Sequence, residues 1–420
     1  MVRHVQNRAQ RRKRSPRLGD VVRERVNDLA LVGGFGSWQM TVLQRIAACG
    51  TGLLGWVYRD CSDCGSIQSA GLGCQDRHCP GCGTGRAQEW SDAREEELLD
   101  CNYFHFVFTW PGRLYPLFLE NQQALYGLAM RCVNDTLKSF AQDPKFLGGT
   151  PSAFAVLHTT NRQLDFHPHI HVAIAGAGLD EKNGKLVTAR KPDFLFPARA
   201  LAAGFRRRLL QGIEALSAAG KLTFNGPSVR DLASPRTRRT VLAGLRKINW
   251  QVHTKQAFGG PKQVIRYLAR YTHRTAISDR RIVALDNGNV TYAWADRKTG
   301  RSRFKTLPVM DFIRKFTRHI LPKGFKRVRL WGLLSPPKRR TALPLAQRLA
   351  AAKAGRDRVH QAIRAVLQPE VRKVHSCPDC GTGTMRHLCI AGRARPPRRF
   401  PAVLPTPPPM PRATAPPGSP

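Results

Sequence analysis

The clearest alternation of apolar and polar positions in the chain runs from residue 164 to residue 174. Isoleucine and valine side chains alternate there with His169 and His171. This period of two is typical of a half-buried β-strand, whose successive side chains point to opposite faces. His169 and His171 are therefore expected to lie side by side on one face, with the apolar side chains on the other.

A second apolar run, residues 153–158, precedes this strand and ends at His158. Only a short polar loop, 159–163, separates the two runs. Strand, short loop and strand predict an antiparallel hairpin. Pairing in that hairpin places His158 across the ladder from His169 and His171.

The rest of the chain mixes strand and helix patterns, so the expected fold class is α+β. Residues 20–46 predict two short helices joined by a glycine-rich turn, and 184–196 is expected to be irregular. Asn287-Gly288 is a strong hairpin signal between two apolar runs. The predicted strands are 104–110, 250–254, 281–285, 290–294 and 303–307, and the predicted helices are 114–140, 197–218, 262–272 and 309–319.

Two Cys-x-x-Cys knuckles, each followed by glycine, lie in the N-terminal part of the chain. They consist of Cys61 with Cys64 and Cys79 with Cys82. Their spacing is that of a structural Zn²⁺ site with four thiolate ligands. Cys74 and His78 are spare donors, either of which could replace one of the four, and the sequence leaves that choice open.

Cys377 and Cys380 form a lone knuckle near the C-terminus. One knuckle supplies half of a tetrahedral ligand set, so it is a weaker zinc signal. These two cysteines are candidates for a second zinc site.

Charge points to a polyanionic partner. The chain has 69 Lys and Arg against 28 Asp and Glu, a formal net charge of +41. Such an excess favours nucleic acid over a membrane surface, since the chain shows no long basic helix with a lipid-facing side. The sequence shows no stretch of transmembrane length and no signal-peptide core, so a cytoplasmic, nucleoid-associated bacterial protein is expected.

The histidines suggest a second kind of metal centre. His158, His169 and His171 can surround one divalent ion, which would polarise a phosphoryl oxygen and orient a scissile phosphate. His167 is an alternative third ligand in place of His158.

Tyr267 and Tyr271 are four residues apart, so on a helix they share one face. Nearby cations could bind DNA phosphates and stabilise a phenolate that attacks phosphorus. These cations are Lys262, Arg266, Arg270 and Arg274. Two such tyrosines can each form a phosphotyrosine link with a DNA end.

With these motifs in place, the chain resembles the two-tyrosine HUH transposases of the IS91 insertion-sequence family, which move DNA by a rolling-circle route. Four segments carry the resemblance in order. They are the cysteine segment from Cys61 to Cys82, the run His167-Pro168-His169-Ile170-His171, the turn Phe258-Gly259-Gly260-Pro261 leading to Tyr267 and Tyr271, and Leu321-Pro322-Lys323-Gly324-Phe325 before Leu330-Trp331-Gly332.

The resemblance implies an HUH endonuclease-like antiparallel sheet of five strands, flanked by helices, with the histidines on a central strand and the tyrosine helix packed over it. It implies Mg²⁺ or Mn²⁺ as the catalytic ion and single-stranded DNA of the element ends and target as the substrate. Cleavage would give a 5′-phosphotyrosine and then rejoining. Host helicase and replication proteins are expected partners, because the chain lacks a nucleotide-binding loop.

The expected domains follow from these segments. They are a disordered basic tail at 1–20, N-terminal helices and a zinc-binding domain at 21–100, the HUH two-tyrosine catalytic domain at 101–320, a basic helical region at 321–376, a zinc knuckle at 377–389 and a disordered Pro- and Arg-rich tail at 390–420.

Two other functions fit these features less well. A catalytically inactive, zinc-dependent DNA-binding protein from a decayed element would fit the charge and the knuckles, but it has no use for paired histidines and paired tyrosines. A tyrosine recombinase would need a His-x-x-Arg motif and one tyrosine without metal, and this set is not found in the sequence.

Overall fold

The computed structural model describes residues 15–83, 94–258, 275–296, 299–353, 376–392, 395–397 and 399–408. The chain divides into two compact units, each assembled from separate segments. Unit 1 combines residues 1–83, 277–317 and 374–420, and unit 2 combines 84–276 and 318–373. The predicted helix 262–272, with both tyrosines and the four cations beside them, lies outside the described residues.

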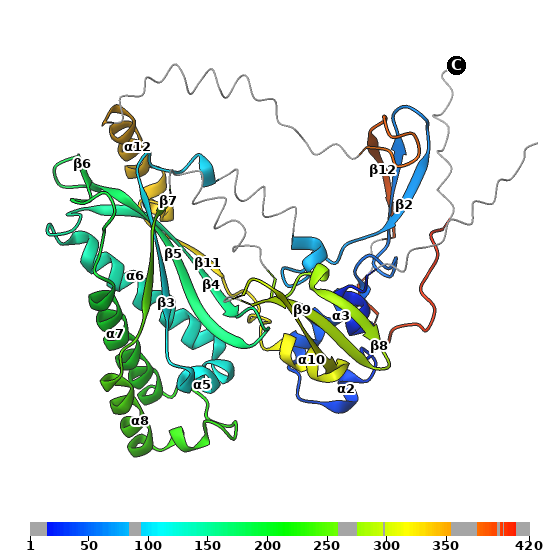
Figure 1. Ribbon diagram of the computed structural model, residues 1–420, viewed down its shortest axis with the longest axis horizontal. Helices are drawn as coiled ribbons and strands as arrows, with labels where there is room; N and C mark the ends of the chain where they lie inside the picture. The colour runs from blue at the N-terminus through cyan, green and yellow to red at the C-terminus, as the bar shows by residue number, and fades with distance from the viewer. Residues whose placement is uncertain are drawn as a thin grey trace, which may run out of the picture. The chain divides into compact units, whose positions relative to one another are not determined.

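Unit 2 is built on a six-stranded antiparallel sheet with the order β11-β4-β5-β3-β7 and with β6 paired to β5. The long strand β5, which carries the histidines, lies between β4 and β3 (Figure 1). The strands are β3 (Tyr103–Thr109), β4 (Thr150–Thr160), β5 (Phe166–Asp180), β6 (Lys185–Thr188), β7 (Val252–Phe258) and β11 (Val328–Gly332). This sheet confirms the predicted fold class, with β6 found where irregular chain was expected.

The β4–β5 hairpin confirms the prediction from the apolar alternation, because His158 pairs directly with His169 in its register. Asn161 shapes the turn. Its side-chain oxygen accepts hydrogen bonds from the backbone N–H groups of Gln163 and Asp165, both at 2.8 Å. Such Asx geometry is a common way to close a short loop.

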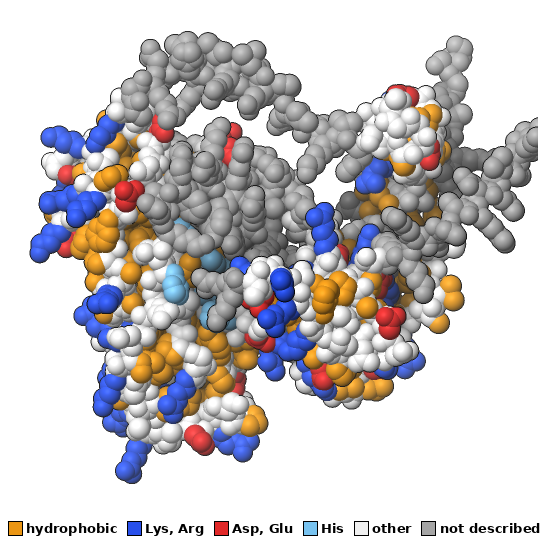
Figure 2. Space-filling model, in the orientation of Figure 1, with side chains coloured by type: hydrophobic (Ala, Val, Ile, Leu, Met, Phe, Trp, Pro, Cys, Tyr) orange, Lys and Arg blue, Asp and Glu red, His pale blue; other side chains and the backbone are white. Residues whose placement is uncertain are grey.

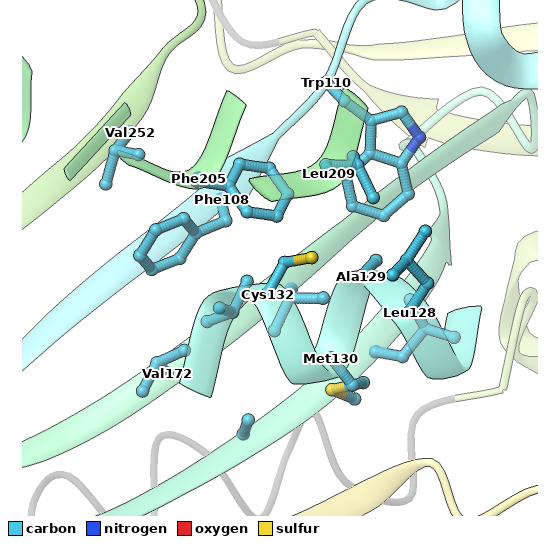
Figure 3. Close-up of a cluster of buried hydrophobic side chains, with 14 of the residues drawn as sticks. Phe108, Trp110, Leu128, Ala129, Met130, Cys132, Val172, Phe205, Leu209 and Val252 are labelled. Atoms are coloured by element: carbon cyan, nitrogen blue, oxygen red, sulfur yellow. The ribbon is translucent and has the colours of Figure 1, made fainter. Parts of the chain in front are cut away.

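One face of this sheet packs on helices α6 and α7. Phe106 and Phe108 of β3 belong to this core together with Ile170 and Val172 of β5. Figure 3 shows Phe108 and Val172 among side chains of α6 and α7, and the Phe205 ring of α7 meets Phe108 edge to face at 5.4 Å. The covering helices are α5 (Tyr115–Glu120), α6 (Gln122–Gln142), α7 (Ala198–Ala218) and α8 (Pro235–Lys247).

The opposite face is covered differently along its length. Ala173, Ala175 and Ala177 of β5 pack there with Leu343 and Ala346 of α12 (Ala342–Lys353). Strand alternation puts His169 and His171 on this same face, beyond the alanines. On this face, α12 covers the C-terminal part of β5, which carries the alanines, and the histidines lie in the N-terminal part of the same strand.

The predicted long helix 114–140 is present but broken at Asn121 into α5 and α6 after a turn of 3₁₀-helix, η1 (Gly112–Leu114). The buried Asn121 side chain donates to the carbonyls of Leu117 and Thr223 and accepts from the Thr223 N–H at 2.8 Å. The helix is therefore interrupted at the residue whose side chain forms hydrogen bonds with a loop distant in sequence.

Unit 1 contains α1 (Leu18–Arg23), α2 (Leu29–Val32) and α3 (Ser37–Ala48) in place of the two predicted helices. The predicted hairpin at 281–294 is present, with Asn287 and Gly288 both at positive φ in its turn. The elements around this hairpin are η3 (Asp279–Arg281), β8 (Ile282–Asp286), β9 (Asn289–Ala295), β10 (Ser302–Pro308) and α10 (Val309–Thr317). The short 3₁₀-helix η2 (Arg230–Ala233) belongs to unit 2, where it precedes α8. Residues 277–317, which lie within the expected catalytic domain 101–320, belong to unit 1 together with the N-terminal helices.

A separate three-stranded sheet of unit 1 has the order β12-β1-β2. Its strands are β1 (Trp56–Cys61), β2 (Ile67–Gly71) and β12 (Met385–Ala391), so its two outer strands come from distant parts of the chain. The segment expected to be a disordered C-terminal tail also makes contacts, since the Asn27 side chain forms hydrogen bonds with both the N–H and the carbonyl of Phe400.

Among the described residues, no helix combines the length and apolar character needed to cross a membrane. The short α11 (Pro336–Arg339) precedes α12 in unit 2.

Candidate metal centres

Three histidines gather on the face of the unit 2 sheet opposite α6 and α7. His158, His169 and His171 each offer a ring nitrogen, and these atoms all lie within 4.8 Å of one another. His158 and His171 are buried while His169 is partly exposed, so the cluster can be reached from one side. Histidine side chains reach the surface on the face shown in Figure 2.

The ring of His169 is held in one orientation. Its Nδ1 lies 2.7 Å from the carbonyl oxygen of His167. A carbonyl only accepts, so Nδ1 carries the proton and Nε2 keeps its lone pair. That Nε2 lies 3.1 Å from Nε2 of His171, which directs both nitrogens toward a common point.

His171 is held by a residue that was not among the predicted ligands. Nε2 of the fully buried His105, on β3, lies 2.9 Å from Nδ1 of His171. The signal for His105 in the sequence is a histidine between two phenylalanines in a mostly apolar strand. Since a metal-binding imidazole usually donates its other N–H to a partner, His105 suits that partner's role.

The cluster has the dimensions of a metal site. Two ligand atoms at right angles around an ion at about 2.1 Å are about 3.0 Å apart, and the His169–His171 separation is 3.1 Å. His169 and His171 therefore have the spacing of two ligands of one divalent ion, and a ring nitrogen of His158 lies within 4.8 Å of theirs.

His167, the alternative ligand, is engaged elsewhere. Its Nδ1 lies 2.7 Å from the hydroxyl oxygen of Tyr115, at the start of α5. Burial lowers the pKa of His167 and raises the pKa of Tyr115. The Tyr115 hydroxyl is therefore hydrogen-bonded to the His167 ring, and His167 is absent from the three-histidine group.

The cysteines of unit 1 form two four-sulfur clusters. The first joins Cys49, at the end of α3, with three cysteines that follow β2, and the second joins one knuckle from each end of the chain. The members are Cys49, Cys74, Cys79 and Cys82 in the first, and Cys61, Cys64, Cys377 and Cys380 in the second.

This arrangement differs from the predicted set. Cys61 and Cys64 were expected to join Cys79 and Cys82, but β1 carries the first knuckle to β12 and away from the second. Cys74, an alternative donor, is a cluster member, whereas the His78 ring lies 2.8 Å from a carboxylate oxygen of Asp76. Cys49 was missed because it has no partner at knuckle spacing, although, like the three knuckles, it precedes a glycine.

Two protein families match the chain, one in its N-terminal part and one in its central part. The family described as "Putative transposase" matches residues 152–342, and the family "Transposase zinc-binding domain" matches residues 21–110. The first range contains the three histidines and also Tyr267 and Tyr271. No solved structure matches the chain.

Two relatives extend the similarity along the chain. The "Putative transposase y4qJ" of Sinorhizobium fredii is 37% identical over 373 residues, covering 86% of this chain and 92% of the relative. The "Transposase for insertion sequence element IS801" of Pseudomonas savastanoi pv. phaseolicola is 29% identical over 309 residues, 72% of each chain.

These matches define the class as a transposase with an N-terminal zinc-binding domain. The chain belongs to the IS91 family of insertion-sequence transposases. The resemblance stated from the motifs is thereby confirmed, and DNA, the partner suggested by the net charge, is the substrate of this class. Figure 2 shows Lys and Arg side chains spread widely over the face in view.

Proposed function

We propose that this transposase cuts and rejoins single-stranded DNA in a metal-dependent reaction that proceeds through 5′-phosphotyrosine links, as rolling-circle transposition requires. The observation that supports the proposal is the convergence of three imidazoles on the face of the sheet opposite α6 and α7. A DNA-binding protein without catalysis gains nothing from three converging ligand nitrogens, one of them partly exposed.

His158, His169 and His171 would hold the ion, and His105 would keep the His171 ring in place. A divalent ion bound there supplies a Lewis acid for a phosphoryl oxygen of the scissile phosphate. The imidazole set suits Mn²⁺ better than Mg²⁺, because Mg²⁺ prefers oxygen ligands.

Tyr267 and Tyr271 would act as nucleophiles in turn. A phenolate oxygen attacks the phosphorus, the bond from phosphorus to the 3′ oxygen breaks, and the departing 3′ oxygen takes up a proton. The DNA 5′ end is then joined to tyrosine. Rejoining is the reverse, in which a 3′ hydroxyl attacks the phosphotyrosine and releases the phenol.

The basic side chains would hold the substrate. Lys262, Arg266, Arg270 and Arg274 are placed by sequence around the two tyrosines, and they would contact phosphates of the bound strand. The zinc-binding domain would keep unit 1 folded and take no part in the chemistry, because a site closed by four thiolates leaves no open position for substrate.

Covalent trapping tests the proposal. The protein is incubated with labelled single-stranded DNA of an element end and Mn²⁺, and a protein–DNA adduct is sought on a denaturing gel. The adduct should form with the parent chain and with Tyr58→Phe, a change in unit 1. It should be lost when Tyr267→Phe and Tyr271→Phe are combined.

The alternative function makes the opposite prediction. A catalytically inactive DNA-binding protein would shift the same oligonucleotide on a native gel without forming an adduct at any Mn²⁺ or Mg²⁺ concentration. That result, obtained with element-end DNA that is bound tightly, would overturn the proposed reaction.

A further inference from the structure

We propose that Cys61, Cys64, Cys377 and Cys380 hold a zinc ion of their own, which ties the C-terminal segment of the transposase to its N-terminal domain. The match to the zinc-binding family ends at residue 110, so half of this ligand set lies far beyond it. Each knuckle alone offers two thiolates, and neither closes a tetrahedral site without the other.

Distances between the sulfurs fit one ion. Sγ of Cys61 lies 3.7 Å from Sγ of Cys380, and Sγ of Cys64 lies 3.8 Å from Sγ of Cys377. With Zn–S bonds of about 2.3 Å, the edge of a tetrahedron is about 3.8 Å. No described disulfide joins these residues, and all four cysteines are free thiols.

The two knuckles have the same local structure. In each, the second residue after the first cysteine points its backbone N–H at that cysteine's sulfur: Asp63 to Cys61 and Asp379 to Cys377, both at 3.4 Å. Gly65 and Gly381 follow the second cysteines at positive φ. Backbone N–H groups directed at sulfur stabilise thiolates, so both knuckles are shaped for metal binding.

Gly383 allows the knuckles to approach each other. A Cβ at this position would overlap Sγ of Cys61 and come within 2.9 Å of the Asp63 carboxyl carbon. The Gly383 N–H also points at Sγ of Cys380 at 3.3 Å. A residue of the C-terminal segment is thus fitted to a cysteine of the N-terminal one.

The backbone around the four sulfurs is joined as well. β12 pairs with β1 in antiparallel register along its length. Beyond the strands, the Ser62 N–H donates to the Thr384 carbonyl and the Thr384 N–H donates to the Ser62 hydroxyl, each at 2.9 Å. These bonds bring together ligands that are 313 residues apart in the case of Cys64 and Cys377.

Zinc content tests the shared site directly. Full-length protein carrying His169→Ala, which keeps zinc out of the histidine cluster, is expected to hold two zinc ions, one for each cysteine cluster. Replacing Cys61 and Cys64 by serine should leave one ion, and so should replacing Cys377 and Cys380. Because both pairs serve the same ion, the fourfold variant should also retain one.

The control variant changes Cys101→Ser and Cys132→Ser, which lie outside both clusters, and it should keep two ions. A fourfold variant that holds no zinc would overturn the proposal, since each knuckle would then serve a different ion. Retention of two ions after loss of Cys377 and Cys380 would overturn it too.

Thiol footprinting needs no substitution and covers the case in which serine variants misfold. The parent chain is titrated with a zinc chelator, and alkylation of each cysteine is read by mass spectrometry. Cys61, Cys64, Cys377 and Cys380 should become reactive together. Immediate alkylation of Cys377 and Cys380 while Cys61 and Cys64 stay protected would contradict the shared site. Neither measurement uses DNA, so the result is independent of the proposed cleavage reaction.

Discussion

The rings of His105 and His171 lie parallel, with 4° between their planes and with Nε2 of His105 2.9 Å from Nδ1 of His171. Their strands, β3 and β5, are neighbours in the central part of the sheet. This contact leaves Nε2 of His171 directed at His169, so a fully buried residue decides which nitrogen of His171 faces the cluster.

His105→Ala is expected to weaken Mn²⁺ binding by about 10- to 100-fold, because the His171 ring loses the partner that orients it. His105→Gln should recover most of the affinity, since an amide oxygen can accept the same N–H. Titration calorimetry with Mn²⁺ measures both. The control is His253→Ala, an exposed histidine on β7. Equal weakening in the alanine and glutamine variants would assign His105 a packing role only.

His169→Ala is expected to lower adduct formation by more than about a hundredfold, since the loss of an ion worth several kcal/mol removes that much rate. Affinity for single-stranded DNA should hardly change, because basic side chains supply it. Denaturing gels give the first quantity and fluorescence anisotropy the second. If affinity fell as far as cleavage does, His169 would be a DNA contact.

Mn²⁺ should support cleavage at a lower concentration than Mg²⁺. Three imidazole nitrogens are a poor replacement for the oxygen ligands that Mg²⁺ prefers, and a transition metal accepts them more readily. Adduct yield measured against the concentration of each ion tests this preference. Half-maximal yield at lower Mg²⁺ than Mn²⁺ would argue for additional oxygen ligands.

Removal of zinc from the first cysteine cluster should unfold unit 1. Cys82→Ser takes one of four ligands from a site whose binding energy is part of the folding energy. We expect loss of the corresponding thermal transition, and a strong chelator should have the same effect on the parent chain. Melting followed by circular dichroism, with Cys101→Ser as the control, provides the measurement. A chelated protein that melts at an unchanged temperature would rule out structural zinc.

Asn121→Ala should destabilise unit 2 by about 1–3 kcal/mol, because the backbone groups of Leu117 and Thr223 lose their hydrogen bonds to the buried Asn121 side chain. Urea denaturation followed by tryptophan fluorescence measures the change. Asn183→Ala, an exposed loop change, should lie within about 0.5 kcal/mol of the parent chain. A neutral result for Asn121→Ala would mean that water replaces the lost bonds.

Local patterns in the sequence predicted the central part of the unit 2 sheet well. The alternation around His169 gave a strand, the polar loop gave a hairpin, and together they placed His158 opposite His169, as the register shows. Each of these steps depends on neighbours a few residues apart. The break at Asn121 escaped prediction because it results from a loop about a hundred residues away.

The cysteine partners could not be predicted in the same way. Knuckle spacing identifies metal-binding pairs, but it does not say which pair meets which, since that depends on the pairing of β1 with β12. Cys49 has no knuckle at all and reaches its cluster only because α3 ends there. His105 could have been suspected from its place in an apolar strand, yet its partner was not visible in the sequence.

The pairing of β1 with β12 also affects synthesis on the ribosome. The segment with β1, Cys61 and Cys64 keeps an open strand edge and an incomplete ligand set until its partners have been made, and Cys377 comes 313 residues after Cys64. A gene copy cut short by a frameshift or by a second insertion would never supply the missing strand, and its product would be an easy substrate for cellular proteases. The fold of this sheet and its cysteine cluster thereby depends on translation continuing through Cys377, Cys380 and β12.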